Sequence, residues 1–183
     1  MSYGNGTYVA IDADDIGAET FFDGNKTSIE LSIADDIPYD KTVVNMASNQ
    51  FSSTTGYYNR STYSTFADGF QYKGFFIELS MPVAIYLTDV YLYRQRKKTQ
   101  PLNVVIVGSK NNGEFHLITE ATSLQYTISG YEACAKIAVQ ITDAYDRFRV
   151  IITRIGYIQE DGVLDILNRA NLAQIEFYGK QEL

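Results

Sequence analysis

Three segments in the second half of the chain alternate apolar and polar residues with a period of two. Between residues 136 and 142, Ile137, Val139 and Ile141 are separated by mostly polar side chains, and residues 147–153 and 172–178 repeat the pattern. Successive side chains of a strand point to opposite faces of its sheet, so this alternation predicts strands that each bury one face.

Further strands are predicted at residues 75–79, 83–94, 102–109 and 115–118, with breaks at Ser80-Met81-Pro82 and Thr99-Gln100-Pro101. Asn112-Gly113 predicts a type I′ hairpin turn, whose two central residues need positive φ. Residues 45–72 are polar and predict exposed loops with one or two edge strands. Helical patterns occur only at 12–22 and 163–171, and neither sustains an apolar stripe. We expect an all-β antiparallel sandwich or jelly roll with minimal helix.

Length and cysteine content limit the class of protein. The 183 residues, 45% of them hydrophobic, predict one domain over 1–183. The single cysteine, Cys134, excludes an intrachain disulfide and a cysteine-rich zinc site, and it fits a reducing compartment. The first twenty residues have no basic start followed by an apolar run, so we expect synthesis in the cytosol without a signal peptide. The most apolar window, 81–93, is interrupted by Asp89 and predicts no membrane span.

The net charge of −7 is concentrated at the beginning of the chain. Residues 1–40 carry nine acids and one base, Lys26, which leaves 22 − 9 = 13 acids and 15 − 1 = 14 bases for the rest. A protein that binds nucleic acid needs a basic face, and the only basic cluster lies within residues 94–98. We therefore predict no nucleic acid as the main partner.

Five segments together resemble discoidin domains, also called coagulation factor V/VIII type C domains. They are FFDGN (21–25), GFFIELSMPVAIYLTDVYLYRQ (74–95), PLNVVIVGSKNNGEFHLI (101–118), DRFRVIIT (146–153) and LAQIEFYG (172–179). The match is good over 74–179 and is limited to one turn over 1–73. The resemblance implies a galactose-binding-like jelly roll of two antiparallel sheets that binds glycans, lipid headgroups or proteins without catalysis. Phe75 stands where the family usually has Trp, and the disulfide of secreted members cannot form.

The resemblance also implies one structural calcium ion, which family 32 carbohydrate-binding modules hold between the early turn and the closing strand. Asp23 would supply a carboxylate, Gly24 and Asn25 carbonyl oxygens, Thr27 a hydroxyl or carbonyl oxygen, and Gln174 an amide oxygen. Gln174 replaces the usual acid and should weaken the site, because charge tunes calcium affinity. The alternative is a plain turn without metal. Residues 12–23 resemble a calcium loop only in part, and we interpret their acids as a solvated face or helix caps.

Candidate catalytic residues are few. His116 is the only histidine and Cys134 the only thiol, so a cysteine nucleophile would need this pair. We expect both to be buried structural residues. Asp161 and Asp165 could act as acid and base, but acids are too common for the pair to identify a site.

Two segments are candidate binding surfaces. The tyrosine-rich segment combines flat amphipathic rings with flexible hydrogen-bonding groups, which recognition surfaces favour. The basic loop could bind sulfated or phosphorylated glycans, anionic lipid, or the acidic 1–40 segment of a neighbouring copy. The alternatives are rings that cover sandwich edges and a solvated hairpin tip. The candidate residues are Tyr57, Tyr58, Asn59, Arg60, Tyr63 and Tyr72 in the first segment, and Arg94, Arg96, Lys97 and Lys98 in the second.

The chain starts at Met1 and ends four residues after its last predicted strand, so we expect a whole protein. Its polar, tyrosine-rich approach to GFFIEL also resembles discoidin-type proteins of large DNA viruses. We therefore predict a virion structural protein, a minor capsid or host-attachment subunit that contacts protein neighbours or surface glycans. The alternative is a stand-alone carbohydrate-binding lectin, and an enzyme is the third hypothesis.

Overall fold

Strands joined by turns and loops make up the described part of the chain. The computed structural model describes residues 6–11, 30–33, 44–45, 51–52, 55–60, 63–94, 100–129, 132–156, 171–172 and 174–181, and no helix occurs among them. The strands are β1 (Gly6–Ile11), β2 (Glu30–Ile33), β3 (Val44–Asn45), β4 (Ser64–Ala67), β5 (Phe70–Lys73), β6 (Phe75–Arg94), β7 (Pro101–Ser109), β8 (His116–Ala121), β9 (Thr127–Ser129), β10 (Glu132–Ala138), β11 (Tyr145–Ile155), β12 (Asn171–Leu172) and β13 (Gln174–Gln181). All their pairings are antiparallel. The predicted all-β antiparallel class is confirmed.

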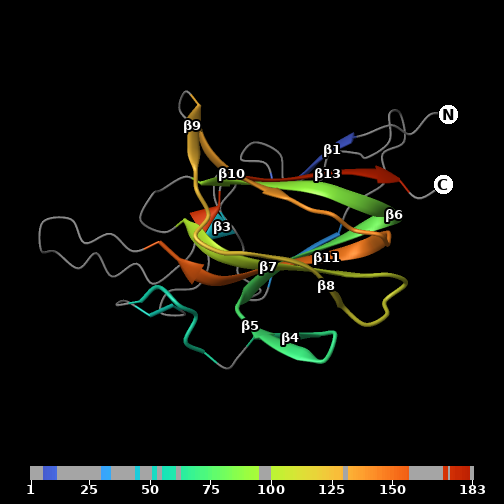
Figure 1. Cartoon of the computed structure of the whole chain (residues 1–183), viewed down its shortest axis with the longest axis horizontal. Coiled ribbons are helices and arrows are strands. Elements are labelled where there is room, and N and C mark those ends of the chain that lie inside the picture. Colours follow the sequence, from blue (N-terminus) through green and yellow to red (C-terminus); the bar gives the residue numbers. More distant parts are fainter. Residues whose placement is uncertain are drawn as a thin grey trace, which may run out of the picture.

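The long strand β6 belongs to both layers of the sandwich (Figure 1). Its residues 75–80 pair with β11 and β2, whereas residues 85–94 pair with β13 and β10. Ile85 also pairs with Tyr145, the first residue of β11. Residues 81–84 have no ladder partner among the described strands. Pro82, which has no N–H to donate, therefore lies where the chain passes between layers. The predicted turn at residues 80–82 is wrong, because the strand bends there and continues.

Side chains that face inward from both layers form the core. Phe148 of β11 meets Phe177 of β13 with ring centroids 5.7 Å apart, and both rings are fully buried. Burying a side chain of this size stabilises the fold by about 1.5–3 kcal/mol. The predicted inward alternation at residues 147–153 is confirmed. In the predicted strand 136–142, Ile137 and Val139 are buried and Ile141 is partly buried against the core, but β10 ends at Ala138. The buried set includes Phe75, Ile77, Leu79, Ile85, Leu87, Val90, Leu92, Val104, Ile106, Ile137, Val139, Phe148, Val150, Ile152, Ile175 and Phe177.

A second, smaller apolar cluster lies on the outer face of the β7–β11 layer. Val105, Val107 and Ile151 point to this face, where the β4–β5 hairpin covers them with Ala67 and Tyr72. This cover explains why β7 is buried almost continuously rather than at alternate positions. Figure 1 shows the hairpin below the two layers of the sandwich. The one or two edge strands expected within residues 45–72 include β4 and the start of β5.

The hairpin turn between β7 and β8 lies one residue earlier than predicted. Positive φ angles occur at Asn111 (54°) and Asn112 (56°), and Gly113 has none. The Gly113 N–H donates to the Lys110 carbonyl at 2.9 Å, which closes the turn over residues 110–113. Asparagine tolerates the left-handed region, so two asparagines take the places assigned to Asn-Gly. The segments with a helical pattern, 12–22 and 163–171, lie outside the described residues.

Candidate functional site

A cleft of about 450 Å³ opens where the turn between β7 and β8 meets the loop that precedes β11. Ligand sites of proteins commonly have a volume of this order. Three rings and three charged side chains lie around it, so the cleft can offer both apolar faces and hydrogen bonds. It is lined by Tyr86, Lys110, Gly113, Glu114, His116, Asp143, Ala144 and Tyr145.

The rings of Tyr145 and His116 stack in this cleft, with centroids 6.1 Å apart and planes 28° from parallel. Tyr145 is only 9% exposed and meets Phe148 of the core edge to face at 6.3 Å. Gly108 lies against the tyrosine ring, where an added Cβ would be 2.6 Å from two of its carbons. The Tyr145 ring is therefore packed against Phe148 of the core and against Gly108 of β7.

Two β11 residues hold the turn 110–113 that forms one wall of the cleft. Both carboxylate oxygens of Asp146 accept from the backbone N–H of Asn111, at 3.1 and 3.2 Å. The Arg147 guanidinium donates to the Gly113 carbonyl at 3.1 Å, and to Ser109 Oγ at 3.2 Å. A wall held by side chains from a central strand needs little ordering when a ligand binds.

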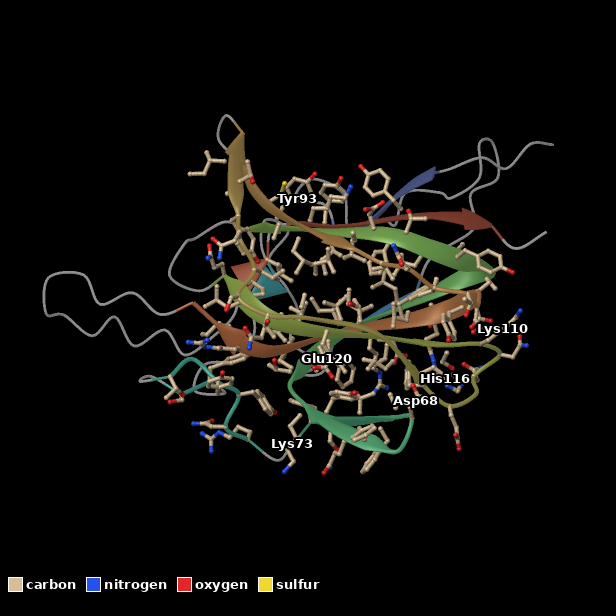
Figure 2. The ribbon with its side chains drawn as sticks, in the orientation of Figure 1. Asp68, Lys73, Tyr93, Lys110, His116 and Glu120 are labelled. Atoms are coloured by element: carbon tan, nitrogen blue, oxygen red, sulfur yellow. The ribbon has the colours of Figure 1, made fainter. Side chains whose placement is uncertain are left out.

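Asp68, at the tip of the β4–β5 hairpin, fixes the orientation of His116. One carboxylate oxygen binds His116 Nδ1 at 2.8 Å, and the other accepts from the Leu117 N–H at 2.7 Å. The Leu117 bond first, and then the His116 bond, hold the pKa of Asp68 below its ordinary value. When Nδ1 donates to Asp68, the neutral imidazole presents Nε2 as an acceptor. Figure 2 shows Asp68 and His116 together at this end of the molecule.

His116 was expected to be buried, and this prediction is wrong. Its side chain is 52% exposed and lines the cleft, because it lies on β8, the last strand on the path of the main sheet. Cys134, also expected to be buried, is partly exposed on β10. Asp161 and Asp165 lie outside the described residues.

Burial and nearby carboxylates act on the hydroxyl of Tyr145, which lines the cleft. The pKa of Tyr145 is raised above its ordinary value, first by burial of the hydroxyl and then by the charges of Asp143 and Asp68. The phenol therefore stays protonated at neutral pH and can donate a hydrogen bond to a ligand.

The tyrosine-rich segment lies apart from the residues that line the cleft. Tyr58 and Tyr63 are half-buried against Phe51 and Phe75, with ring centroids 5.6 and 6.1 Å apart respectively. Tyr72 is also half-buried and belongs to the outer cluster. These three rings thus cover apolar residues, as the alternative interpretation expects.

The most exposed tyrosine of that segment is Tyr57, at 49%, with the Arg154 guanidinium stacked 4.9 Å from its centroid. Asn59 and Arg60 are exposed as well. Binding at this segment stays a prediction.

Most residues of the two remaining predicted sites lie outside the described part of the chain. Among the basic residues, Arg94 ends β6 as a backbone position and Arg96, Lys97 and Lys98 are not described. Gln174 opens β13 opposite Tyr93, whereas Asp23, Gly24, Asn25 and Thr27 are not described. The described residues contain no group of three or more metal-binding side chains. Calcium binding stays a prediction.

Sequence reasoning missed the hairpin that carries Asp68, although a signal for it was present. Asp68-Gly69 has positive φ at both residues, 49° and 82°, as a type I′ turn requires. Asp-Gly between short aromatic segments is a strong hairpin signal. The tip also exposes two rings, Phe66 at 64% and Phe70 at 68%.

Comparison with known proteins gives structural likeness only. No protein-family model matches the chain, and no curated protein sequence does. The F5/8 type C domain of a Bacteroides fragilis protein covers 84% of this chain, which covers 93% of that domain, at 13% identity and a TM-score of 0.48. The family 32 carbohydrate-binding module of Clostridium perfringens NanJ, solved with galactose, covers 82% of this chain, which covers 93% of that module. The identity is 11% and the TM-score is 0.43.

The C-terminal domain of a Bacteroides fragilis chitobiase covers 60% of this chain, at 16% identity and a TM-score of 0.41, and the chain spans 65% of that domain. Several of the structures that resemble this chain are F5/8 type C domains or family 32 carbohydrate-binding modules. At identities of 8–16% the likeness concerns the fold and does not identify a ligand.

Among the described residues, no helix is long and apolar enough to cross a membrane.

Proposed function

We propose that this protein is a non-catalytic saccharide-binding module whose binding site is the cleft around Tyr145 and His116. The observation that carries the proposal is the stacked pair of rings beside charged hydrogen-bonding groups in a cleft of about 450 Å³. A sugar ring has apolar C–H faces and polar hydroxyl edges. Aromatic faces pack against the first, and carboxylates, amines and imidazoles bind the second.

The carboxyl groups of the cleft favour binding over hydrolysis. A glycosidase keeps its acid protonated at neutral pH by burying it against apolar side chains. Glu114 and Asp143 are both exposed. Neither is buried against apolar side chains as such an acid is, so we infer no acid catalyst between them.

A glycan array followed by calorimetric titration tests this proposal. Glu114→Ala and Tyr86→Ala alter the cleft lining, and we expect each to weaken binding of an array-identified glycan by about tenfold, the loss expected for one good polar or stacking contact. Tyr57→Ala is the matched control, because its exposed ring lies outside the cleft lining. We expect this variant to bind normally.

Two results would overturn the proposal. One is an array without any binding signal. The other is loss of binding in Tyr57→Ala with normal binding in both cleft variants, which would assign the site to the tyrosine-rich segment. A role as a virion structural protein stays a prediction.

A further inference from the structure

The charges around the cleft are unequal in sign. Its lining contains two carboxylates, Glu114 and Asp143, and one ammonium group, Lys110. Asp68 adds a third carboxylate directly behind His116. Figure 2 shows Asp68, Lys110 and His116 at the same end of the sandwich.

The two carboxylates of the lining have acceptor positions open to a ligand. Glu114 has no hydrogen bond or ion pair with the described residues, and Asp143 accepts only from Thr142 Oγ1, at 3.1 Å. A ligand cation would therefore meet carboxylates with open acceptor positions.

Residues behind the cleft wall do not reverse this balance. Arg147 adds a positive charge behind the turn, where its guanidinium binds Ser109, Asn112 and Gly113. Asp146, its neighbour on β11, adds a negative one at the same turn. In and behind the cleft lining there are thus four carboxylates and two cations. Two of the carboxylates, Asp143 and Asp68, contribute to the raised pKa of Tyr145.

We propose that the cleft selects saccharides by charge: it favours a sugar with a protonated amino group and rejects one with a carboxylate or sulfate group. This inference rests on the proposed saccharide-binding function and adds the class of ligand. Glu114, exposed and without a described partner, is the acceptor for the ammonium group. The preference is electrostatic, so it should weaken as salt increases.

Two matched ligand series test this selectivity. Glucosamine differs from glucose only at C2 and glucuronate differs from it only at C6, and galactosamine and galacturonate differ from galactose in the same way. Binding is measured at pH 7 and low salt by NMR titration, with the Gly113 and Leu117 amides as reporters. In at least one series, we expect the amino sugar to bind about three to ten times more tightly than the neutral sugar, and the uronate to bind more weakly than either.

Two variants locate the effect. Glu114→Gln removes the proposed acceptor and should bring the amino sugar to within about twofold of the neutral one, because a single charged contact is lost. Glu120→Gln is the control, since Glu120 is an exposed carboxylate on the same strand, β8, that does not line the cleft. It should leave the preference unchanged.

The outcomes separate this inference from the proposed function. If neutral sugars bind and the uronates bind as tightly or more tightly, the charge selectivity is wrong and the saccharide site remains. Equal loss of preference in Glu114→Gln and Glu120→Gln would also overturn it, because the effect would then come from net charge. If no member of either series binds, and the glycan array is also silent, the proposed function itself fails.

Discussion

Asp68 and His116 join two parts of the protein that are 48 residues apart in sequence, through a 2.8 Å contact between Oδ1 and Nδ1. The same carboxylate accepts from the Leu117 backbone, on the last strand on the path of the main sheet. Asp68 thus satisfies a donor of an edge strand and orients a ring of the cleft. A ligand that contacts His116 therefore acts on a group whose position depends on the β4–β5 hairpin.

The titration of Asp68 should reveal both bonds. Its folded pKa is depressed, so its contribution to stability is present above its ordinary pKa of 3.8 and is lost as pH falls through the folded value. We expect carboxyl NMR to give a midpoint below 3.8 in the wild type. In His116→Ala the midpoint should rise but stay below the ordinary value, because the Leu117 bond is the larger cause. An ordinary midpoint in the wild type would contradict this account.

Gly108→Ala should disturb the cleft and the core together. The new Cβ would lie 2.6 Å from the Tyr145 ring and 2.8 Å from Ile118 Cδ1, so the tyrosine must move. We expect a loss of about 1–3 kcal/mol in the free energy of unfolding, typical of overpacking, with weaker glycan binding. Urea denaturation and NMR titration measure the two effects. Unchanged aromatic NMR shifts of Tyr145 would show that the ring does not occupy this position.

Arg147→Lys tests whether the turn 110–113 is held in place by the guanidinium. Lysine keeps the charge but loses the planar set of donors that reaches Ser109 and the Gly113 carbonyl. We expect faster hydrogen exchange at the turn and glycan binding weaker by about three- to tenfold, equivalent to about 1 kcal/mol. The matched control is Arg154→Lys, which alters a stack on Tyr57 outside the cleft. Equal effects of both substitutions would argue against a specific role for Arg147.

The sequence predicts the sandwich well because alternation depends on local side-chain order. Residues 147–153 show it clearly, and β11 follows that pattern. The sequence signals mislead at β6, whose two halves belong to different layers. Ser80-Met81-Pro82 resembles a turn, although β6 continues through these residues. The alternation also fails for β7, because a hairpin from elsewhere in the chain covers its second face.

The cleft is harder to predict, since its residues come from separate elements. Tyr86, Glu114 and Tyr145 are brought together only by the pairing of β6, β7 and β11 with their neighbours. His116 is predicted to be buried from the sequence, whereas its exposure follows from the edge position of β8. The tyrosine-rich composition, by contrast, predicts a binding surface, but three of its four candidate tyrosines are half-buried.

Arg149 and Glu78 form the ion pair that joins β11 to β6 beneath the hairpin. The guanidinium carbon lies 4.1 Å from the centroid of the Phe76 ring and 4.6 Å from that of Phe115, and the guanidinium also donates to Thr65 Oγ1 at 3.0 Å. The side chains are only 21% and 14% exposed. Removal of one member therefore leaves the other partly buried and without its counter-charge.

We expect Glu78→Leu and Arg149→Met each to lower the free energy of unfolding by about 2 kcal/mol, less than for a fully buried pair because some solvent contact remains. The double variant should lose no more than either single variant, since no charge is then left unpaired. Chemical denaturation of all four proteins measures this coupling. Additive losses would mean that the two charges act independently, and that the rings and Thr65 hold Arg149 without help from the carboxylate.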